Sequence, residues 1–150
     1  SAHYHNSFRA LSTVSTYRPP RRTPKPRVDG VVTGVVQPGP QGQTNGTAVL
    51  DSEGRYTVSF HFDFAAPGQS KSSRPVRVAQ PFGGMGHGMH FPLRPGTEVA
   101  VAFVNGDPDR PIIVGAIYNA ESPSPVAARN PSVNRITTAS GSLFEISEKR

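Results

Sequence analysis

The stretch Arg55-Tyr-Thr-Val-Ser-Phe-His-Phe-Asp-Phe64 has the clearest periodicity in the chain. From Tyr56 onward, an aromatic residue or a valine occupies every second position, and polar residues occupy the positions between. Strict alternation over such a length is typical of a β-strand with one face in a core and the other in water. We therefore predict a strand over residues 55–64, with Phe60 and Phe62 pointing into the core.

Short segments on both sides of this stretch have strand-like patterns as well. β-branched residues dominate residues 28–36, where glycines 30 and 34 match the bend of a strand in a small barrel. Further strands are expected at residues 47–50, 74–80, 96–105 and 111–119. The 15 Gly, 16 Pro and 35% hydrophobic residues also favour many short strands joined by turns. The expected fold class is all-β, with one small barrel of five or six strands over residues 28–120.

Proline-rich linkers flank the predicted barrel. Tyr17-Arg-Pro-Pro-Arg-Arg-Thr-Pro-Lys-Pro-Arg27 contains four prolines, which favour an extended polyproline II conformation. A second linker without periodicity covers residues 120–131. Residues 135–148 alternate again around an expected turn at Ser140-Gly-Ser142, but such a segment is too short to be stable alone.

The net charge of +6 belongs almost entirely to the N-terminal tail. Residues 1–30 hold six basic side chains and one acidic side chain, whereas the rest of the chain holds ten basic and nine acidic ones. Arginines of this kind can bind phosphates, but a single-strand binder also needs exposed aromatic side chains. Because we assign the strand aromatics to the core, we expect no nucleic-acid binding and interpret the arginines as contacts to a neighbouring domain or subunit.

Two features of the sequence suggest phosphate or metal binding. The loop Gly83-Gly-Met-Gly-His-Gly88 is glycine-dense, but it lacks the Lys-Ser/Thr and the helix of a P-loop, so we interpret it as a tightly packed loop across the barrel. His3 with His5, and His87 with His90, offer two imidazoles each without a third ligand at suitable spacing. We expect neither a metal nor a cofactor. The lack of cysteine also excludes disulfides and thiolate chemistry.

A hydrolase would require a nucleophile beside a base. The nearest candidates are His61 with Asp63, Asp107 with Asp109, and Glu98. His61 and Asp63 share the polar face of the predicted strand and are expected to form a surface pair. The other two aspartates lie in a proline-rich turn, where they would accept backbone donors. We therefore expect no catalytic residue and no enzymatic activity.

Six strings occur in a characteristic order between residues 17 and 119. They are Tyr17-Arg-Pro-Pro-Arg21, Pro24-Lys-Pro-Arg-Val28, Arg55 to Asp63, Val76-Arg-Val-Ala-Gln80, Phe91-Pro-Leu-Arg-Pro-Gly-Thr-Glu-Val99 and Gly106-Asp-Pro-Asp-Arg-Pro-Ile-Ile-Val-Gly115. Together they resemble the central barrel of the VgrG spike proteins of type VI secretion and of the related phage tail-spike protein. Tryptophans that are frequent in that family are replaced here by Phe62, Phe82 and His87, which makes the chain a divergent member.

The resemblance implies an oligosaccharide/oligonucleotide-binding (OB) fold that serves as a collar between a trimeric hub and a trimeric β-helix needle. It implies three regions: the end of the hub and the linker (1–27), the barrel (28–120), and a second linker with the start of the β-helix (121–150). The function expected from it is structural, with envelope puncture and effector delivery by the whole assembly. The alternative is a free-standing OB-fold domain that binds single-stranded nucleic acid or oligosaccharide.

The same resemblance sets the expected partners and location. The chain would form a homotrimer and meet a tube protein, a spike-tip protein and effectors, and the assembly would contact a target membrane mechanically. It would reside in the bacterial cytoplasm before assembly and then be secreted through the injection apparatus. The absence of a signal-peptide pattern and of a long apolar run agrees with this route.

Overall fold

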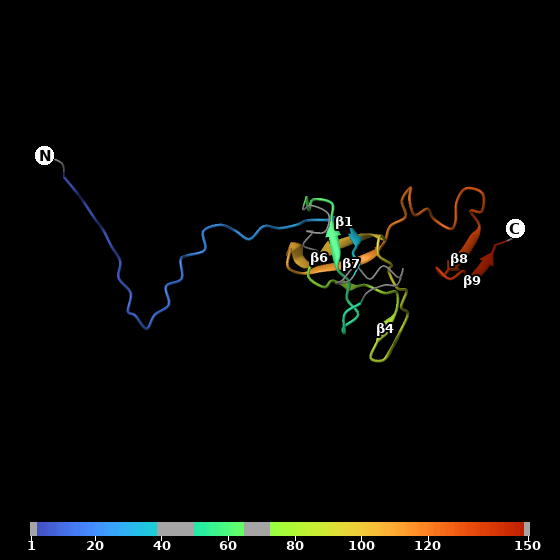
Figure 1. Ribbon diagram of the computed structural model, residues 1–150, viewed down its shortest axis with the longest axis horizontal. Helices are drawn as coiled ribbons and strands as arrows, with labels where there is room; N and C mark the ends of the chain where they lie inside the picture. Colours follow the sequence, from blue (N-terminus) through green and yellow to red (C-terminus); the bar gives the residue numbers. More distant parts are fainter. Residues whose placement is uncertain (1–2, 39–49, 65–72, 149–150) are drawn as a thin grey trace.

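The computed structural model describes residues 3–38, 50–64 and 73–148, and almost all of its regular structure is β (Figure 1). The main sheet consists of β1 (Val31–Val36), β2 (Val58–Phe60), β3 (Arg77–Val78), β6 (Glu98–Phe103) and β7 (Pro111–Ala116). Two separate hairpins are formed by β4 (Gly83–Gly84) with β5 (His87–Gly88), and by β8 (Val133–Thr137) with β9 (Leu143–Ser147). Within the described ranges, the one helical segment is the 3-10 turn η1 (Val104–Gly106). The all-β fold class is confirmed.

The main sheet has the strand order β2-β1-β6-β7-β3, and only the β3–β7 pair is parallel. Its two outer strands, β2 and β3, do not pair with each other as a ladder. One isolated bridge links their segments instead, with Tyr56 N donating to Val76 O (2.9 Å) and Val76 N donating to Tyr56 O (2.7 Å). The predicted ring of strands is therefore not closed by a continuous ladder.

The core is small and consists mainly of valines. Its fully buried members are Val36, Tyr56, Val58, Val76, Val99, Val101 and Ile113. Alternation in β6 explains how Val99 and Val101 enter this core while Ala100 and Ala102 do not. Gly34 allows β1 and β2 to come close together, because a Cβ atom there would lie 2.6 Å from Val58 Cγ1.

The predicted strand over residues 55–64 is correct only in its first half. Tyr56 and Val58 are buried, and Phe60 is half-buried against the core. The strand then ends at a turn in which Asp63 N donates to Phe60 O at 2.9 Å. Phe62 is 61% exposed, so the prediction that it points into the core is wrong. The alternation continues in the sequence, but pairing with β1 stops at Phe60 and so no longer fixes the face of the residues that follow.

Other predicted strands are present with shorter bounds. The 74–80 segment contributes only β3 and the bridge at Val76. Of the predicted strand 47–50, residues 47–49 lie outside the described residues, and Leu50 is not in a strand. The terminal alternating segment forms the β8–β9 hairpin around the predicted turn, where Thr138 N donates to Ser142 O. The β-helix that this hairpin would begin remains a prediction.

The N-terminal segment extends away from the sheet (Figure 1). Residues 3–27 are exposed and contain no strand. The hub strand expected in residues 1–16 would require a partner outside this chain, and it stays a prediction.

Candidate functional site

The last residues of the N-terminal linker dock on the turn between β6 and β7. Lys25 Nζ pairs with Asp107 Oδ1 and lies 2.8 Å from Asp109 Oδ2. Asp107 Oδ1 also accepts the backbone N–H of Asp109 at 2.9 Å, so the turn holds the carboxylate in place. The hydrogen bond from Lys25 lowers the pKa of Asp107, and the same bond raises the pKa of Lys25. Because these side chains are solvent-accessible, salt screens their attraction.

Backbone groups continue the docking of this linker. Val28 N donates to Gly106 O at 2.9 Å, and Arg27 NH2 donates to Asn105 O at 3.0 Å. Gly106 has φ +71°, and a Cβ atom there would come within 3.2 Å of Asp29 Oδ1. We call the contacts of Lys25, Arg27 and Val28 with residues 105–109 the N-terminal latch. Arg27 thus contacts its own domain, and contact of the linker arginines with a neighbouring domain or subunit stays a prediction.

Sequence reasoning missed this latch. It predicted that the aspartates of the turn accept backbone donors, and Asp107 does so. It did not predict the pairing with Lys25, which lies 82 positions away. The available signal was opposite charge: a lysine between two prolines, and two aspartates beside a proline in a tight turn.

A second junction fixes the chain where it leaves β7. Asn119 Oδ1 accepts the backbone N–H groups of Glu121 (3.0 Å) and Ser122 (2.7 Å). Its amide nitrogen donates to Glu98 Oε2 at 2.7 Å, and the other oxygen of Glu98 lies 3.9 Å from His61 Nε2. Two of the candidate catalytic side chains, His61 and Glu98, therefore come together here. Glu98 anchors the exit of the chain from the domain.

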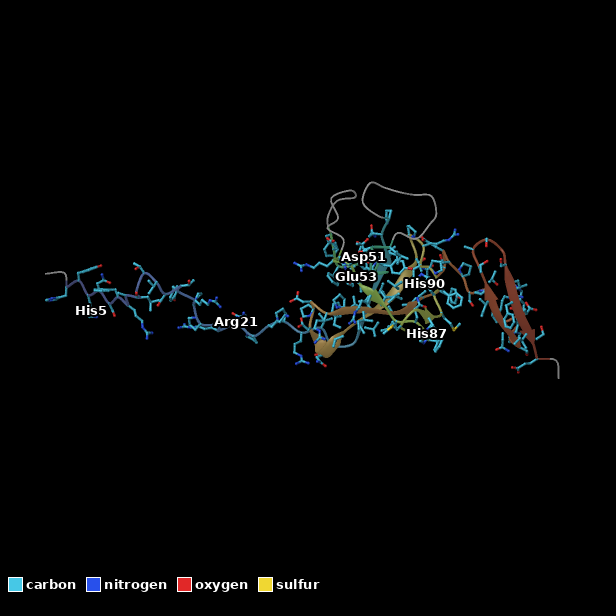
Figure 2. The ribbon with its side chains drawn as sticks, turned by 90° about the horizontal axis from the view of Figure 1, so that it is seen from below. His5, Arg21, Asp51, Glu53, His87 and His90 are labelled. Atoms are coloured by element: carbon cyan, nitrogen blue, oxygen red, sulfur yellow. The ribbon has the colours of Figure 1, made fainter. Side chains whose placement is uncertain are left out.

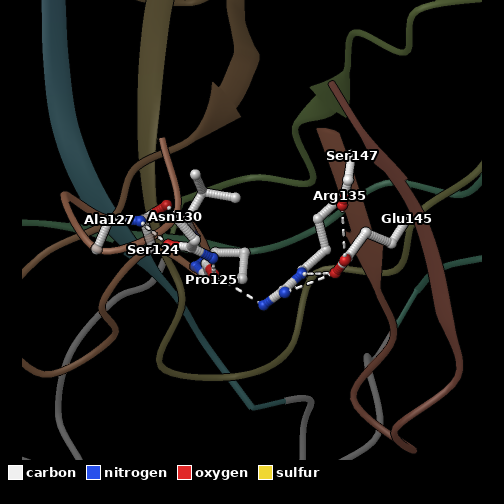
Figure 3. Close-up of polar contacts among 8 residues, drawn as sticks. Ser124, Pro125, Ala127, Asn130, Arg135, Glu145 and Ser147 are labelled. Carbon is white, nitrogen blue, oxygen red and sulfur yellow. Dashed lines mark hydrogen bonds and ion pairs between the residues drawn. The ribbon is translucent and has the colours of Figure 1, made fainter. Parts of the chain in front are cut away.

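The second linker is folded against the terminal hairpin (Figure 3). Asn130 Oδ1 accepts the N–H of Ala127 at 2.8 Å. Arg135 NH1 donates to Pro125 O at 3.1 Å, while Arg135 Nε and NH2 donate to Glu145 Oε2 at 2.9 and 2.6 Å. One arginine of β8 thus ties the linker to β9. The predicted aperiodic linker is correct in that it contains no strand, but side-chain contacts hold it.

The glycine-rich loop forms the β4–β5 hairpin. The ring of His87 packs on Phe82 with a centroid distance of 5.4 Å, and its Nδ1 lies 3.1 Å from the carbonyl oxygen of Met85. A Cβ atom at Gly84 would lie 2.5 Å from the His87 ring. Glycine is required here so that the His87 side chain can lie across the backbone. The residues of this hairpin are exposed, so the prediction of a tightly packed loop across the barrel is wrong.

The remaining side chains that the sequence suggested for metal or phosphate binding are spread over the molecule (Figure 2). His5 and Arg21 lie on the extended N-terminal segment, whereas His87 and His90 lie near the β4–β5 hairpin. Within residues 3–38, 50–64 and 73–148, no three His, Asp or Glu side chains gather as a metal site would require. The same residues include no helix long and apolar enough to cross a membrane. Phe62 and Phe64 are exposed, so the assignment of all aromatic residues of this stretch to the core is wrong. That assignment was the basis for expecting no nucleic-acid binding.

Comparisons with known proteins identify the domain. The family described as the type VI secretion system/phage-baseplate injector OB domain matches residues 46–118. The type VI secretion spike protein VgrG4b of Pseudomonas aeruginosa is 43% identical over 122 residues, which cover 81% of this chain and 15% of that protein. VgrG3 of Vibrio cholerae, also a type VI secretion spike protein, is 40% identical over 83% of this chain and 12% of its own length.

A third relative has a different name. The actin cross-linking toxin VgrG1 of Vibrio cholerae is 41% identical over 102 residues, which cover 68% of this chain and 9% of that protein. The chain thus spans only a small part of the length of each of these relatives. The family match covers every strand of the main sheet except β1, whereas Lys25, Arg27 and Val28 of the latch and Asn119 of the second junction lie outside it. This chain belongs to the VgrG family of spike proteins and contains their injector OB domain.

Proposed function

We propose that this chain is a structural collar of a contractile injection apparatus and has no active site of its own. The observation that supports this most is that contacts outside the core fix both connectors of the OB domain. The N-terminal latch holds the chain before β1, and the Glu98–Asn119 contact holds it after β7. A domain that transmits force between two neighbouring domains requires connectors with a fixed direction more than it requires a ligand pocket.

We propose three regions along the chain. Residues 1–27 are the end of an upstream hub and its linker, residues 28–120 the OB domain, and residues 121–150 a linker and the start of a needle. Every strand of the main sheet lies between residues 31 and 116. The β8–β9 hairpin lies apart from that sheet (Figure 1).

The terminal hairpin supports assembly as a homotrimer. Its larger apolar side chains are about half exposed: Ile136 43%, Leu143 58%, Phe144 60% and Ile146 52%. A two-stranded hairpin is marginal by itself, so further copies of the chain would supply the missing surface. The partners proposed beyond these copies are a tube protein, a spike-tip protein and effectors, with secretion through the apparatus. The toxin activity named for one relative is not proposed for this chain, which matches 9% of that protein.

Sedimentation velocity tests this function. We expect the full-length protein to be a trimer at micromolar concentration, and this chain to associate more weakly because it offers less surface. A version of the chain ending at Asn119 should be the most monomeric of the three. A monomeric full-length protein at micromolar concentration would refute the spike function.

A further inference from the structure

Both methionines of the chain lie in one short stretch, together with two of its five histidines. This stretch is Met85-Gly-His-Gly-Met-His90, and it forms the turn of the β4–β5 hairpin, β5 and the two residues that follow. Residues 79–93 contain no Asp, Glu, Lys or Arg. The segment therefore combines thioethers and imidazoles in the absence of carboxylate, ammonium and guanidinium groups.

The hairpin brings three of these side chains to one surface. Its ladder continues past β5, because Met89 N donates to Phe82 O at 2.9 Å. Side chains alternate along a strand, so those of His87 and Met89 lie on the same face. His90 follows directly, and His87, Met89 and His90 all line one open depression of the surface. Figure 2 shows His87 and His90 near the hairpin.

A hydrogen bond determines which ring nitrogen of His87 can bind a metal ion. Nδ1 lies 3.1 Å from the carbonyl oxygen of Met85. Since a carbonyl oxygen only accepts, a neutral His87 has its proton on Nδ1 and a free lone pair on Nε2. A Cβ atom at Gly84 would lie 2.5 Å from Nε2, so glycine leaves the space beside this nitrogen open. Metal-binding histidines are commonly oriented by a carbonyl in this way.

We propose that His87, Met89 and His90 bind one Cu(I) ion, with Nε2 as the ligand atom of His87. The sulfur of Met85, whose side chain is 99% exposed in the turn, can serve as a fourth ligand. Within the described residues, no third His, Asp or Glu joins the two histidines. A thioether takes that place for a soft ion. The proposal goes beyond the spike function and does not depend on it.

The kind of ligand and the lack of charge both favour Cu(I) over the common divalent ions. Thioether sulfur selects soft ions such as Cu(I), whereas Mg²⁺ and Ca²⁺ take oxygen ligands and Zn²⁺ sites use Cys, His and carboxylates. Residues 79–93 supply no negative charge to offset the cost of removing an ion from water. That cost is larger for a divalent ion than for a monovalent one.

Titration of this chain with Cu(I) in oxygen-free, ascorbate-containing buffer tests the site. The chain has no cysteine that would compete for the ion. We expect the methyl resonance of Met89 to shift in NMR spectra and the change to saturate at one equivalent of Cu(I) per chain. Zn(II) added in excess should leave the shifted resonance in place. An unshifted Met89 methyl resonance, or displacement of Cu(I) by Zn(II), would overturn the proposal.

Competition with the coloured Cu(I) chelator ferrozine then compares variants. Met89→Leu and His87→Phe each remove one ligand from an exposed side chain and keep a similar volume, so the circular dichroism spectrum should not change. We expect each to weaken Cu(I) binding at least about tenfold, since loss of even an outer-shell partner costs that much. The matched control combines His3→Asn with His5→Asn, the other histidine pair, and should bind as the unchanged chain does.

Unaltered affinity in either ligand variant would overturn the assignment of that ligand and with it the site. A loss in the control as large as that in His87→Phe would also overturn the proposal, because the ion would then be bound by the N-terminal histidines. Failure of the chain to bind Cu(I) leaves the spike function standing, since sedimentation tests that function separately.

Discussion

Tyr56 connects its own segment, just before β2, with the segment of Val76 and with the loop at Leu93. Removing its hydroxyl group should therefore destabilise the domain measurably. Its ring is fully buried, its backbone forms the bridge to Val76, and its hydroxyl oxygen accepts the N–H of Leu93 at 3.0 Å. Tyr56→Phe keeps the ring and the bridge but leaves a partly buried N–H without its acceptor. Such a loss costs about 1–2 kcal/mol of unfolding free energy. For a domain of this size, that corresponds to a decrease in Tm of about 5–15 °C.

Urea unfolding followed by far-UV circular dichroism measures this cost, since the chain has no tryptophan. The midpoint should fall while the slope of free energy against urea stays constant, because the exposed surface does not change. Tyr118→Phe is the matched control: that side chain is 63% exposed, and its change should stay within about 0.5 kcal/mol. Equal effects of the two substitutions would show that the contact with Leu93 contributes nothing to stability.

Three further predictions concern packing and the latch. Gly34→Ala should cost about 1–3 kcal/mol in urea melts, because the new methyl group would lie 2.6 Å from a valine of β2; no change would mean that the strands separate freely. Phe60→Ala should cost about 2 kcal/mol and Phe62→Ala less than about 1 kcal/mol, and the reverse order would contradict the exposures given above. Lys25→Met should raise tryptic cleavage after Arg27 several-fold but leave cleavage after Arg22 unchanged, and equal rates in the two proteins would exclude a latch. The pKa of Asp107 is lowered in the fold, so the ion pair of the latch should be fully formed above the ordinary value of 3.8 and be lost as the pH falls through the lowered pKa. Protection of the bond after Arg27 against trypsin should therefore persist at neutral pH.

The sequence predicted those parts of the fold that depend on local patterns. β6 and β7 were found because both contain several valines or isoleucines in a short run bounded by turn formers, and the proline-rich turn between them is present. The error at Phe62 has a different origin. Alternation shows which side chains share a face only while the strand is paired, and nothing in the residues after Phe60 shows where pairing ends. Register and strand ends depend on the partner strand, here β1.

The junctions were beyond sequence reasoning because they depend on contacts between distant residues. Lys25 and Asp107 are separated by 82 positions, and Glu98 and Asn119 by 21. Charge alone leaves many possible pairs, and only the folded sheet selects among them. The family resemblance could place the domain between a hub and a needle, but it could not name the side chains that hold either connector.

The side chains that form the core differ in kind from those that form the junctions, which matters for the proposed role as a force-bearing collar. The fully buried side chains are one tyrosine, five valines and one isoleucine, so the stability of the domain comes mainly from apolar burial. The connectors, in contrast, are held by exposed ion pairs and by hydrogen bonds of Lys25, Asn119 and Arg135. Exposed ion pairs contribute little to the stability of a domain but restrict direction when their geometry is fixed. In the proposed collar, the sequence of the connectors can therefore change the angle at which the proposed hub and needle leave the domain, while the valine core keeps the domain folded.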